Sequence, residues 1–400
     1  MKKLLLVFCC AWAAFTACAQ TDSTRSYNVG LMLPFQTQST LNSISDFFNA
    51  PDFFTASRIS LNNYSEEALD FYQGMLLALN TQKDSIHINL HVYDCWNSDS
   101  VTEVWLKNPE LKKLDVLVGP SSTANARLAA EFCLKNKILN IQPFTPSKSL
   151  ALNNPYHIKL APTIDAHVDN IFASVLDSFE GSNVLIYAPD NEIGTATATR
   201  FDSLFKEYNK TATQKFSVSN LNFKKISAEK KKLSDYLKQT KRNVVIITAF
   251  EGSFVNNTLR LLTDNKGGEE IVLYGMPTWL NSEVMRLDYL NSFNTCVTEG
   301  FYADTTREAT VTFTTQYKER YHKEPTPMSY SGYDAMNFLV YMLSGYGKDF
   351  PEKIMGERYT GAGYKYDVVK QLNAAGNIDY YENRHVNVFR IENYRLKKIW

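Results

Sequence analysis

Residues 115–147, DVLVGPSSTANARLAAEFCLKNKILNIQPFTPS, join two apolar segments through a polar turn and an amphipathic segment. Residues 116–118 are apolar and stop at Gly119-Pro120, as is typical of a buried parallel strand that ends at a breaker. Between residues 124 and 135 apolar side chains recur at helical spacing, which predicts a helix with one face on a sheet. Residues 138–141 follow as a second strand. The sequence therefore predicts a β-loop-α-β unit, the building block of an α/β fold.

The turn of this unit places three hydroxyl groups at the start of the predicted helix, on Ser121, Ser122 and Thr123. Such hydroxyls can accept hydrogen bonds from the free amides of the first helical turn, which is ordinary capping. Together with those amides they can instead hold an anionic or carbonyl group of a ligand. Both interpretations stay open, and all three residues are candidate ligand-binding residues.

The N-terminal residues 1–19 resemble an export signal, with Lys2 and Lys3, an apolar run and a small-residue exit. Two processing routes compete. Ala17-Cys18-Ala19 fits cleavage before Gln20, whereas retention of Cys18 would make the protein a lipid-anchored lipoprotein. We favour plain cleavage, because Phe15 is a poor substitute for the leucine that usually opens a lipoprotein signal.

Charge and cysteine content exclude several functions. The chain has 42 basic and 42 acidic residues, so its balance does not indicate nucleic acid or an acidic membrane surface as a partner. After the leader only Cys95, Cys133 and Cys296 remain, too few and too scattered for a disulfide framework or a metal motif. No later segment approaches the roughly 20 apolar residues of a membrane span. We expect no cofactor, no metal and no membrane span.

Strand and helix patterns alternate along the chain and restart once. Apolar strands are predicted near 28–35 and 88–93, and after a break near 147–160 further strands are predicted near 184–187, 244–248 and 271–274. Such a restart indicates a second lobe. The tail from residue 363 alternates instead, which predicts antiparallel strands.

Residues 36–64 are unusually long for a connection in an α/β protein, where loops usually take about 2 to 6 residues. The segment carries Phe47, Phe48, Phe53 and Phe54 among polar residues. It leaves the carboxyl end of the first strand, beside the crevice where ligands bind in open parallel sheets. We therefore expect a lid, a partner surface, or an extra helix packed down by its aromatic residues.

Seven short motifs, in this order, resemble the type I periplasmic binding protein fold of the branched-chain amino-acid receptors. They are GPSS, IKLAPTIDAH, VLIYAPDNEIG, NVVIITAF, VLYGMP, EGFY and SYSGYDA. The insertion and Phe71-Tyr72-Gln73-Gly74 look closer still to exported relatives often joined to LysM modules, although no LysM segment is visible. Lipoprotein activators of penicillin-binding proteins share this fold.

The resemblance implies two doubly wound Rossmann-like lobes, joined by three crossovers and closing on a ligand in the cleft between them. It places lobe 1 at residues 26–146 and 280–358, with the 36–64 insertion, and lobe 2 at residues 147–279 and 359–400. By analogy with the family, the turn at Ser121 and Ser122 and the corner at 144–147 hold a ligand carboxylate. The implied ligand-binding residues are Ser121, Ser122, Thr123, Thr145, Ser147, Phe250, Trp279 and Phe35.

Two departures from the family argue against a free amino acid as the ligand. After VLYGMP, where the receptors place an acid for the substrate ammonium, this chain has Thr278-Trp279, and Ile193 replaces an expected aromatic residue. A buried ammonium without an anionic partner costs several kcal/mol. Glu251 is a potential substitute. Trp279 and Phe250 favour an apolar, sugar, peptide-like or muropeptide-like ligand, or a site that has lost its ligand.

Motifs for catalysis are missing from the sequence. It contains no G-x-S-x-G nucleophile elbow, no phosphate loop of the G-x-x-x-x-G-K-[ST] type and no H-E-x-x-H. We therefore predict no enzymatic activity and two alternative functions. One is an exported receptor for a small solute. The other is a cell-envelope interaction module, or a lipoprotein regulator of peptidoglycan synthesis, that binds a protein partner through residues 36–64.

Overall fold

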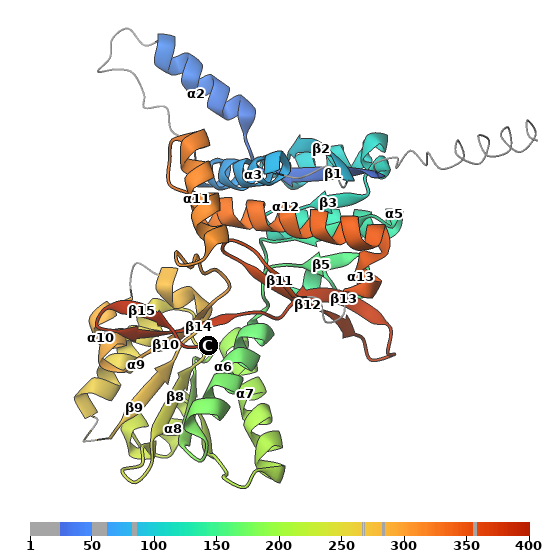
Figure 1. Cartoon of the computed structure of the whole chain (residues 1–400). Helices are drawn as coiled ribbons and strands as arrows, with labels where there is room; N and C mark the ends of the chain where they lie inside the picture. The colour runs from blue at the N-terminus through green and yellow to red at the C-terminus, as the bar shows by residue number, and fades with distance from the viewer. Residues whose placement is uncertain are drawn as a thin grey trace, which may run out of the picture.

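The computed structural model describes residues 25–49, 62–81, 86–265, 267, 269–281, 285–354 and 358–400. The predicted leader at 1–19, with Cys18, lies outside these residues. The described chain forms two lobes, one above the other in Figure 1, each built on a sheet flanked by helices. This architecture confirms the predicted α/β class with two doubly wound lobes.

The sheet of lobe 1 has eight strands in the order β11-β12-β13-β5-β4-β3-β1-β2. Its strands are β1 Arg25–Leu33, β2 Ile86–Asp94, β3 Val116–Val118, β4 Leu139–Gln142, β5 His157–Lys159, β11 Arg358–Thr360, β12 Lys365–Leu372 and β13 Ile378–Asn383. Neighbours from β13 to β2 run parallel, and β11 and β12 add antiparallel pairs at one edge. The parallel strands therefore end at a common edge.

Side chains that alternate along these strands pack on helices on both faces of the sheet. Leu31 and Val118 join a core with helices α3 (Asn63–Thr81) and α12 (Pro327–Tyr346). Their neighbours Met32 and Leu117 point the other way and pack with α4 (Asp99–Lys107) and α5 (Thr123–Asn136). Both faces are covered, which explains why these strands are apolar throughout. The remaining helices of this lobe are α11 Glu308–Tyr321 and α13 Phe350–Lys353.

The sheet of lobe 2 has seven strands in the order β15-β14-β10-β9-β8-β6-β7. Its strands are β6 Asn183–Ala188, β7 Ser217–Asn222, β8 Asn243–Ile247, β9 Ile271–Tyr274, β10 Cys296–Glu299, β14 Asn387–Glu392 and β15 Arg395–Lys398. Its helices are α6 Ile164–Phe179, α7 Glu192–Thr211, α8 Phe223–Ala228, α9 Gly252–Asn265 and α10 Leu287–Ser292. Figure 1 shows α6 and α7 on one side of this sheet and α9 and α10 on the other.

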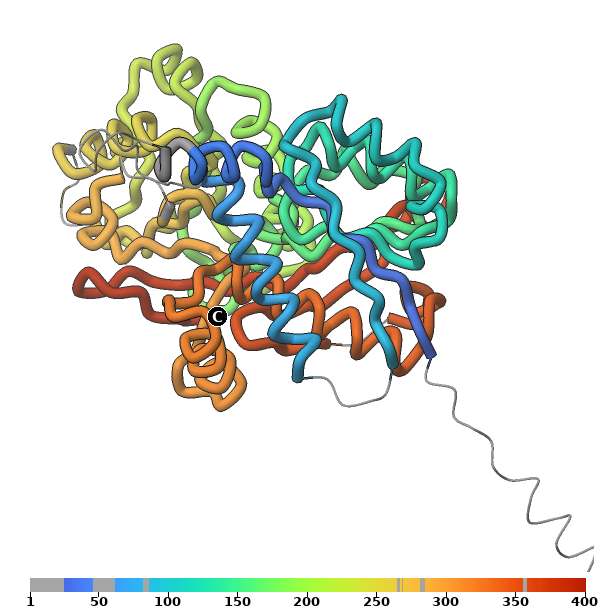
Figure 2. The backbone as a smooth tube through the Cα atoms, turned by 90° about the horizontal axis from the view of Figure 1, so that it is seen from above, coloured from blue at the N-terminus to red at the C-terminus, as the bar shows by residue number. Residues whose placement is uncertain are grey.

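The chain crosses between the sheets three times, but not where the lobe boundaries were predicted. The first crossing follows β5, because Ile158 pairs with Ile141 of β4. The second follows β10, which pairs with β14 in the second sheet. The third lies between β13 and β14, so the red C-terminal segment in Figure 2 belongs to both lobes. Residues 147–160 and most of 361–383 thus lie in lobe 1, and 285–299 in lobe 2.

The insertion after β1 begins with a helix, α2 (Thr37–Asn49), which stands clear of both lobes at the upper left of Figure 1. Asp94 holds its first residue, because its carboxylate accepts from the Thr37 amide at 2.9 Å and hydroxyl at 3.0 Å. The extra helix that was one of the predictions is present, and Leu41 on it is 58% exposed. Its predicted packing depends on aromatic side chains that the structure does not describe. The side chains of Phe47 and Phe48, and residues 50–61 with Phe53 and Phe54, lie outside the description. Within the described ranges, no helix combines the length and the apolar character that crossing a membrane requires.

Candidate functional site

The carboxyl ends of β3 and β4 bring two of the predicted turns together. The Thr123 and Thr145 hydroxyl oxygens lie 3.4 Å apart, and Thr145 is buried. At the base of the turn, Gly119 has a φ of +85°, and a Cβ there would lie 2.6 Å from the Met32 carbonyl oxygen. Only glycine fits this corner. The hydroxyl-bearing turn and the 144–147 corner therefore meet at this edge of the sheet.

Two buried amides fix the relative position of these turns. The Asn140 amide donates to the carbonyls of Leu117 and Gly119, each at 3.1 Å. Gln142 donates to the Pro120 carbonyl at 2.9 Å and accepts from the Phe144 amide at 3.0 Å. Sequence reasoning missed both residues. Their signal was present, because polar side chains inside the buried strand LNIQ must find partners.

Lys159 supports the same corner from below and was also missed. Its side chain is fully buried, and its ammonium donates to the carbonyls of Thr145 at 3.0 Å and Ser147 at 2.5 Å. Burial lowers the pKa of Lys159 to about 8, partly offset by the charge of Glu382. A lysine in the short strand of YHIKLAP was the available signal. Lys159 places positive charge directly beneath the predicted ligand edge.

The other hydroxyls at this edge, on Ser121, Ser122 and Ser147, differ in their hydrogen bonds. Ser122 is the N-cap of α5 and accepts from the Asn125 amide at 3.2 Å, so its hydroxyl has the capping role. Ser147 lies 3.0 Å from the Ser149 hydroxyl. The half-buried Ser121 hydroxyl has no hydrogen-bond partner in the part of the chain that is described. Ser121 thus differs from Ser122, whose hydroxyl is used in the helix cap.

Aromatic residues of α3 pack against this edge. Phe35, which follows β1, meets Tyr72 edge-on with ring centroids 5.8 Å apart. Phe144 packs against Phe71 at 4.7 Å. Phe35 is partly buried and adjoins the lobe 1 core, so it lies at the expected sheet edge.

The two predicted residues of lobe 2 occupy different environments. Phe250 follows β8 and is half-buried against the lobe 2 core. Trp279 is only 1% exposed, and its indole donates to the Ala249 carbonyl at 2.8 Å. Its ring fills the space over Gly275, where a Cβ would lie 2.2 Å from a ring carbon. In this conformation Trp279 positions the 249–251 turn and is not available to stack on a ligand.

Glu251 lies beside Phe250 and is exposed. It accepts from the Asn191 amide at 3.0 Å, which joins the ends of β8 and β6. Ile193, at the start of α7, is 62% exposed. The edge of lobe 2 therefore presents a carboxylate and an apolar side chain to solvent. The described contacts do not join this edge to the hydroxyls of lobe 1, so a shared site requires the lobes to close.

A network of ion pairs ties the crossovers to α6. Asp169 of α6 accepts from Arg200 of α7 at 2.5 Å and also pairs with Arg384, which follows β13. Arg384 in turn pairs with the buried Glu382 of β13. Asp165 of the same helix pairs with Lys148, which follows β4. The network thus links both lobes at their connection.

Replacing Asp169 by asparagine should lower the free energy of unfolding by about 1–2 kcal/mol, because two partly buried guanidinium groups lose their shared acceptor. The loss should shrink in high salt. Urea titrations at two salt concentrations measure it. Asp177→Asn, at the exposed end of the same helix, is the control and should change stability by less than about 0.5 kcal/mol. Equal effects would show that the network does not stabilise the connection.

The described residues form neither a metal-binding cluster nor a disulfide. Among the described residues, no three His, Cys, Asp or Glu side chains gather where they could hold a metal ion. Cys95, Cys133 and Cys296 are buried free thiols. Burial raises the pKa of the Cys95 thiol to about 11, which keeps it protonated and unreactive at neutral pH.

The fold is that of a two-lobed α/β protein with one sheet in each lobe. A family model described as periplasmic binding protein matches residues 102–391, more than half of the chain, and the chain belongs to this family. A search of curated proteins gives no match.

Solved structures show the same fold. A putative branched-chain amino-acid ABC transporter protein from Rhodospirillum rubrum has a TM-score of 0.63 at 12% identity, over 94% of this chain and 100% of that one. A branched-chain amino-acid transporter protein from Rhodopseudomonas palustris gives 0.63 and 12%, over 94% and 96%. An ABC transporter substrate-binding protein from Desulfitobacterium hafniense, in complex with Leu, gives 0.57 and 12%, over 94% and 100%.

Proposed function

We propose that this protein is an exported, non-catalytic receptor that closes its two lobes on a small solute. The observation that carries the proposal is the meeting of the 121–123 turn with the 144–147 corner at the start of α5, above the buried ammonium of Lys159. Helix amides and a nearby positive charge favour a carboxylate or another anionic oxygen group. Membership of the periplasmic binding protein family supports both export and the absence of catalysis.

We further propose a peptide-like ligand, for which muropeptides are one source. Thr278 and Trp279 do not supply the acid that a compact amino acid needs, because Trp279 is buried and the Thr278 hydroxyl lies 3.5 Å from the Phe250 carbonyl. Glu251 lies elsewhere on the lobe 2 edge. One of its carboxylate oxygens accepts from Asn191, and the carboxylate is exposed, so it can also meet an amide or amine further from the ligand carboxylate. Phe250 and Ile193 add apolar surface beside it.

Thermal-shift screening and calorimetry against free amino acids, short peptides, muropeptides and sugars test this proposal. We expect a peptide-like compound to bind, and Ser121→Ala to weaken it at least tenfold, a loss of about 1.4 kcal/mol. Ser122→Ala is the matched control. It should lower the stability of the free protein by about 1 kcal/mol through loss of the cap, while changing affinity much less. Two results would contradict the receptor proposal: no binding of any compound in the panel, or equal effects of both variants on affinity.

A second candidate function rests on α2. This helix projects from lobe 1, and Leu41 is 58% exposed on it. A single exposed leucine is ordinary on a protein surface, so the projection of the helix from the lobe is what supports a protein partner in the cell envelope. Deletion of residues 37–61 should abolish capture of such a partner and leave solute binding intact.

For the leader, we propose removal of residues 1–19, with retention of an acylated Cys18 as the alternative. The intact mass of the protein purified from cells distinguishes cleavage before Gln20 from lipid attachment.

A further inference from the structure

A small hollow lies where the second and third crossovers run side by side, remote in sequence from the 121–147 edge. It has a volume of about 200 Å³ and is lined by Tyr302, Asp304, Arg307, Lys365, Asn387 and Lys398 among others. Backbone pairing holds its wall, because the Tyr302 amide donates to the Gly363 carbonyl at 2.9 Å. We call this hollow the crossover pocket.

Three cations line the crossover pocket without an ion-pair partner. Arg307 donates to the Gly361 carbonyl at 2.9 Å, and Lys398 donates to the Asn387 side-chain oxygen at 2.6 Å. Across the described residues, no carboxylate oxygen lies within 4.0 Å of the charged nitrogens of Arg307, Lys365 or Lys398. The one acid of the pocket, Asp304, is engaged by Thr306 through its amide at 3.0 Å and its hydroxyl at 2.6 Å.

These cations are close enough to affect one another. The pKa of Lys398 is lowered, first by burial and then by the charge of Lys365, with Arg307 acting in the same direction and Asp304 against it. Lys398 also lies over the Tyr302 ring, 5.3 Å from its centroid. The lining residues thus carry three cations and one carboxylate, a charge of about +2. The buried carboxylate of Asp334, which accepts from the amides of residues 362–364, also interacts with Arg307 and reduces this excess without an ion pair. Bound anionic charge would relieve this repulsion.

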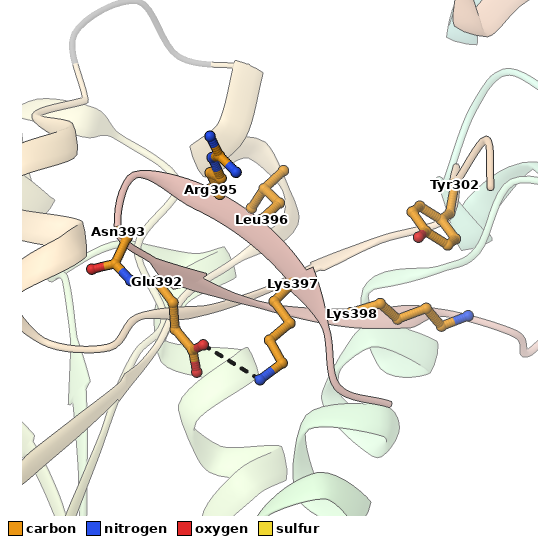
Figure 3. A pocket seen from close by; sticks show the side chains of 7 residues that line it. All are labelled: Tyr302, Glu392, Asn393, Arg395, Leu396, Lys397 and Lys398. Carbon is orange, nitrogen blue, oxygen red and sulfur yellow. Dashed lines mark hydrogen bonds and ion pairs between the residues drawn. The ribbon is translucent and has the colours of Figure 1, made fainter. Parts of the chain in front are cut away.

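A larger groove adjoins the pocket and shares Tyr302 and Lys398 with it. Its volume is about 690 Å³, and the hairpin of β14 and β15 forms its other wall. In Figure 3, Lys398 extends towards Tyr302, whereas its neighbour Lys397 turns to Glu392. Lys397 and Glu392 form an ion pair at 3.5 Å, so Lys397 is compensated and Lys398 is not.

We propose that the crossover pocket binds a phosphate group, with any organic part of the ligand lying in the groove beside the β14–β15 hairpin. A phosphate monoester carries about −1.5 to −2 charges at pH 7, which matches the excess charge better than a single carboxylate does. A guanidinium is suited to paired hydrogen bonds with phosphate oxygens, and lysines add point charges. The site is separate from the solute edge of lobe 1.

Calorimetric titration of the mature chain with inorganic phosphate at constant ionic strength tests the proposal. We expect one saturable site, at least tenfold weaker binding in Lys398→Met and in Lys365→Met, and weaker binding at pH 5.5, where phosphate is a monoanion. Lys397→Met removes the same charge from the neighbouring position and should change affinity less than twofold. Glycerol 3-phosphate should bind at least as tightly as phosphate if the groove holds the organic part. Weaker binding of this ester would confine the site to free phosphate.

Two results would overturn the proposal. One is the absence of saturable phosphate binding. The other is equal weakening by Lys397→Met and Lys398→Met, which would show general attraction to a basic surface. Ser121→Ala should leave phosphate affinity unchanged, so failure of this proposal and failure of the solute receptor are distinguishable.

Discussion

Gly332→Ala should lower the free energy of unfolding by about 3 kcal/mol or more, as expected when atoms are forced into a packed core. Gly332 lies in α12, where a Cβ would be 1.9 Å from the Phe71 carbonyl oxygen of α3. The partner Gly74 is placed reciprocally, with the Ser329 carbonyl oxygen 2.0 Å from its Cβ position. Both obstacles are backbone atoms, so the helices must separate to admit a methyl group.

Gly345→Ala is the matched control, because it lies near the end of the same helix and a Cβ there would meet nothing within 4 Å. It should stabilise the protein by up to about 1 kcal/mol, since alanine favours helix. Urea unfolding of both variants measures the difference. Similar stabilities for the two variants would show that the close approach of α3 and α12 does not limit packing.

Local patterns predicted the central unit well, because its elements are each defined by neighbouring residues. The expected strand, helix and strand at 115–147 appear as β3, α5 and β4. The same holds for the restart that forms lobe 2. A strand's period shows that it is a strand but not which sheet it joins. For that reason residues 157–159, 296–299 and 365–383 were assigned to the wrong lobe.

Only part of the site could be predicted, because the sequence does not show contacts between residues that are far apart in the chain. The sequence placed hydroxyls at a helix start, and the structure brings Thr123 and Thr145 together. It left open whether Ser122 caps α5 or binds a ligand. It could not show that Asn140 and Lys159 hold the turns, because the carbonyls to which they donate lie 12 to 23 residues away in the chain. Nor could it separate an aromatic side chain at a sheet edge, such as Phe250, from one beneath it, such as Trp279. Burial depends on the whole fold.

His157→Leu should stabilise the protein selectively at acid pH. His157 is fully buried, and neither ring nitrogen has a hydrogen-bond partner among the described residues. Burial, assisted by the charge of Lys159, lowers the pKa of this imidazole from 6.5 to about 3. The unfolded chain binds a proton below pH about 6.5, whereas the folded chain does not until its own lower pKa. Stability due to neutral His157 is therefore complete above pH 6.5 and is lost as pH falls.

The expected size follows from about 1.4 kcal/mol per pH unit. Relative to the wild type, the stability of His157→Leu should rise by about 2–3 kcal/mol between pH 7 and pH 4.5. The difference between the two proteins is the quantity to measure, because Asp334 acts with the opposite sign: burial raises its carboxyl pKa to about 6. His167, whose pKa burial lowers to about 4, remains in both proteins and cancels. Urea titrations between pH 7 and pH 4.5 measure the free energies of unfolding of both proteins, and replacement of the exposed His87 by leucine is the control. If the stability difference between His157→Leu and the wild type does not change with pH, the imidazole of His157 is protonated as easily in the folded protein as in the unfolded chain.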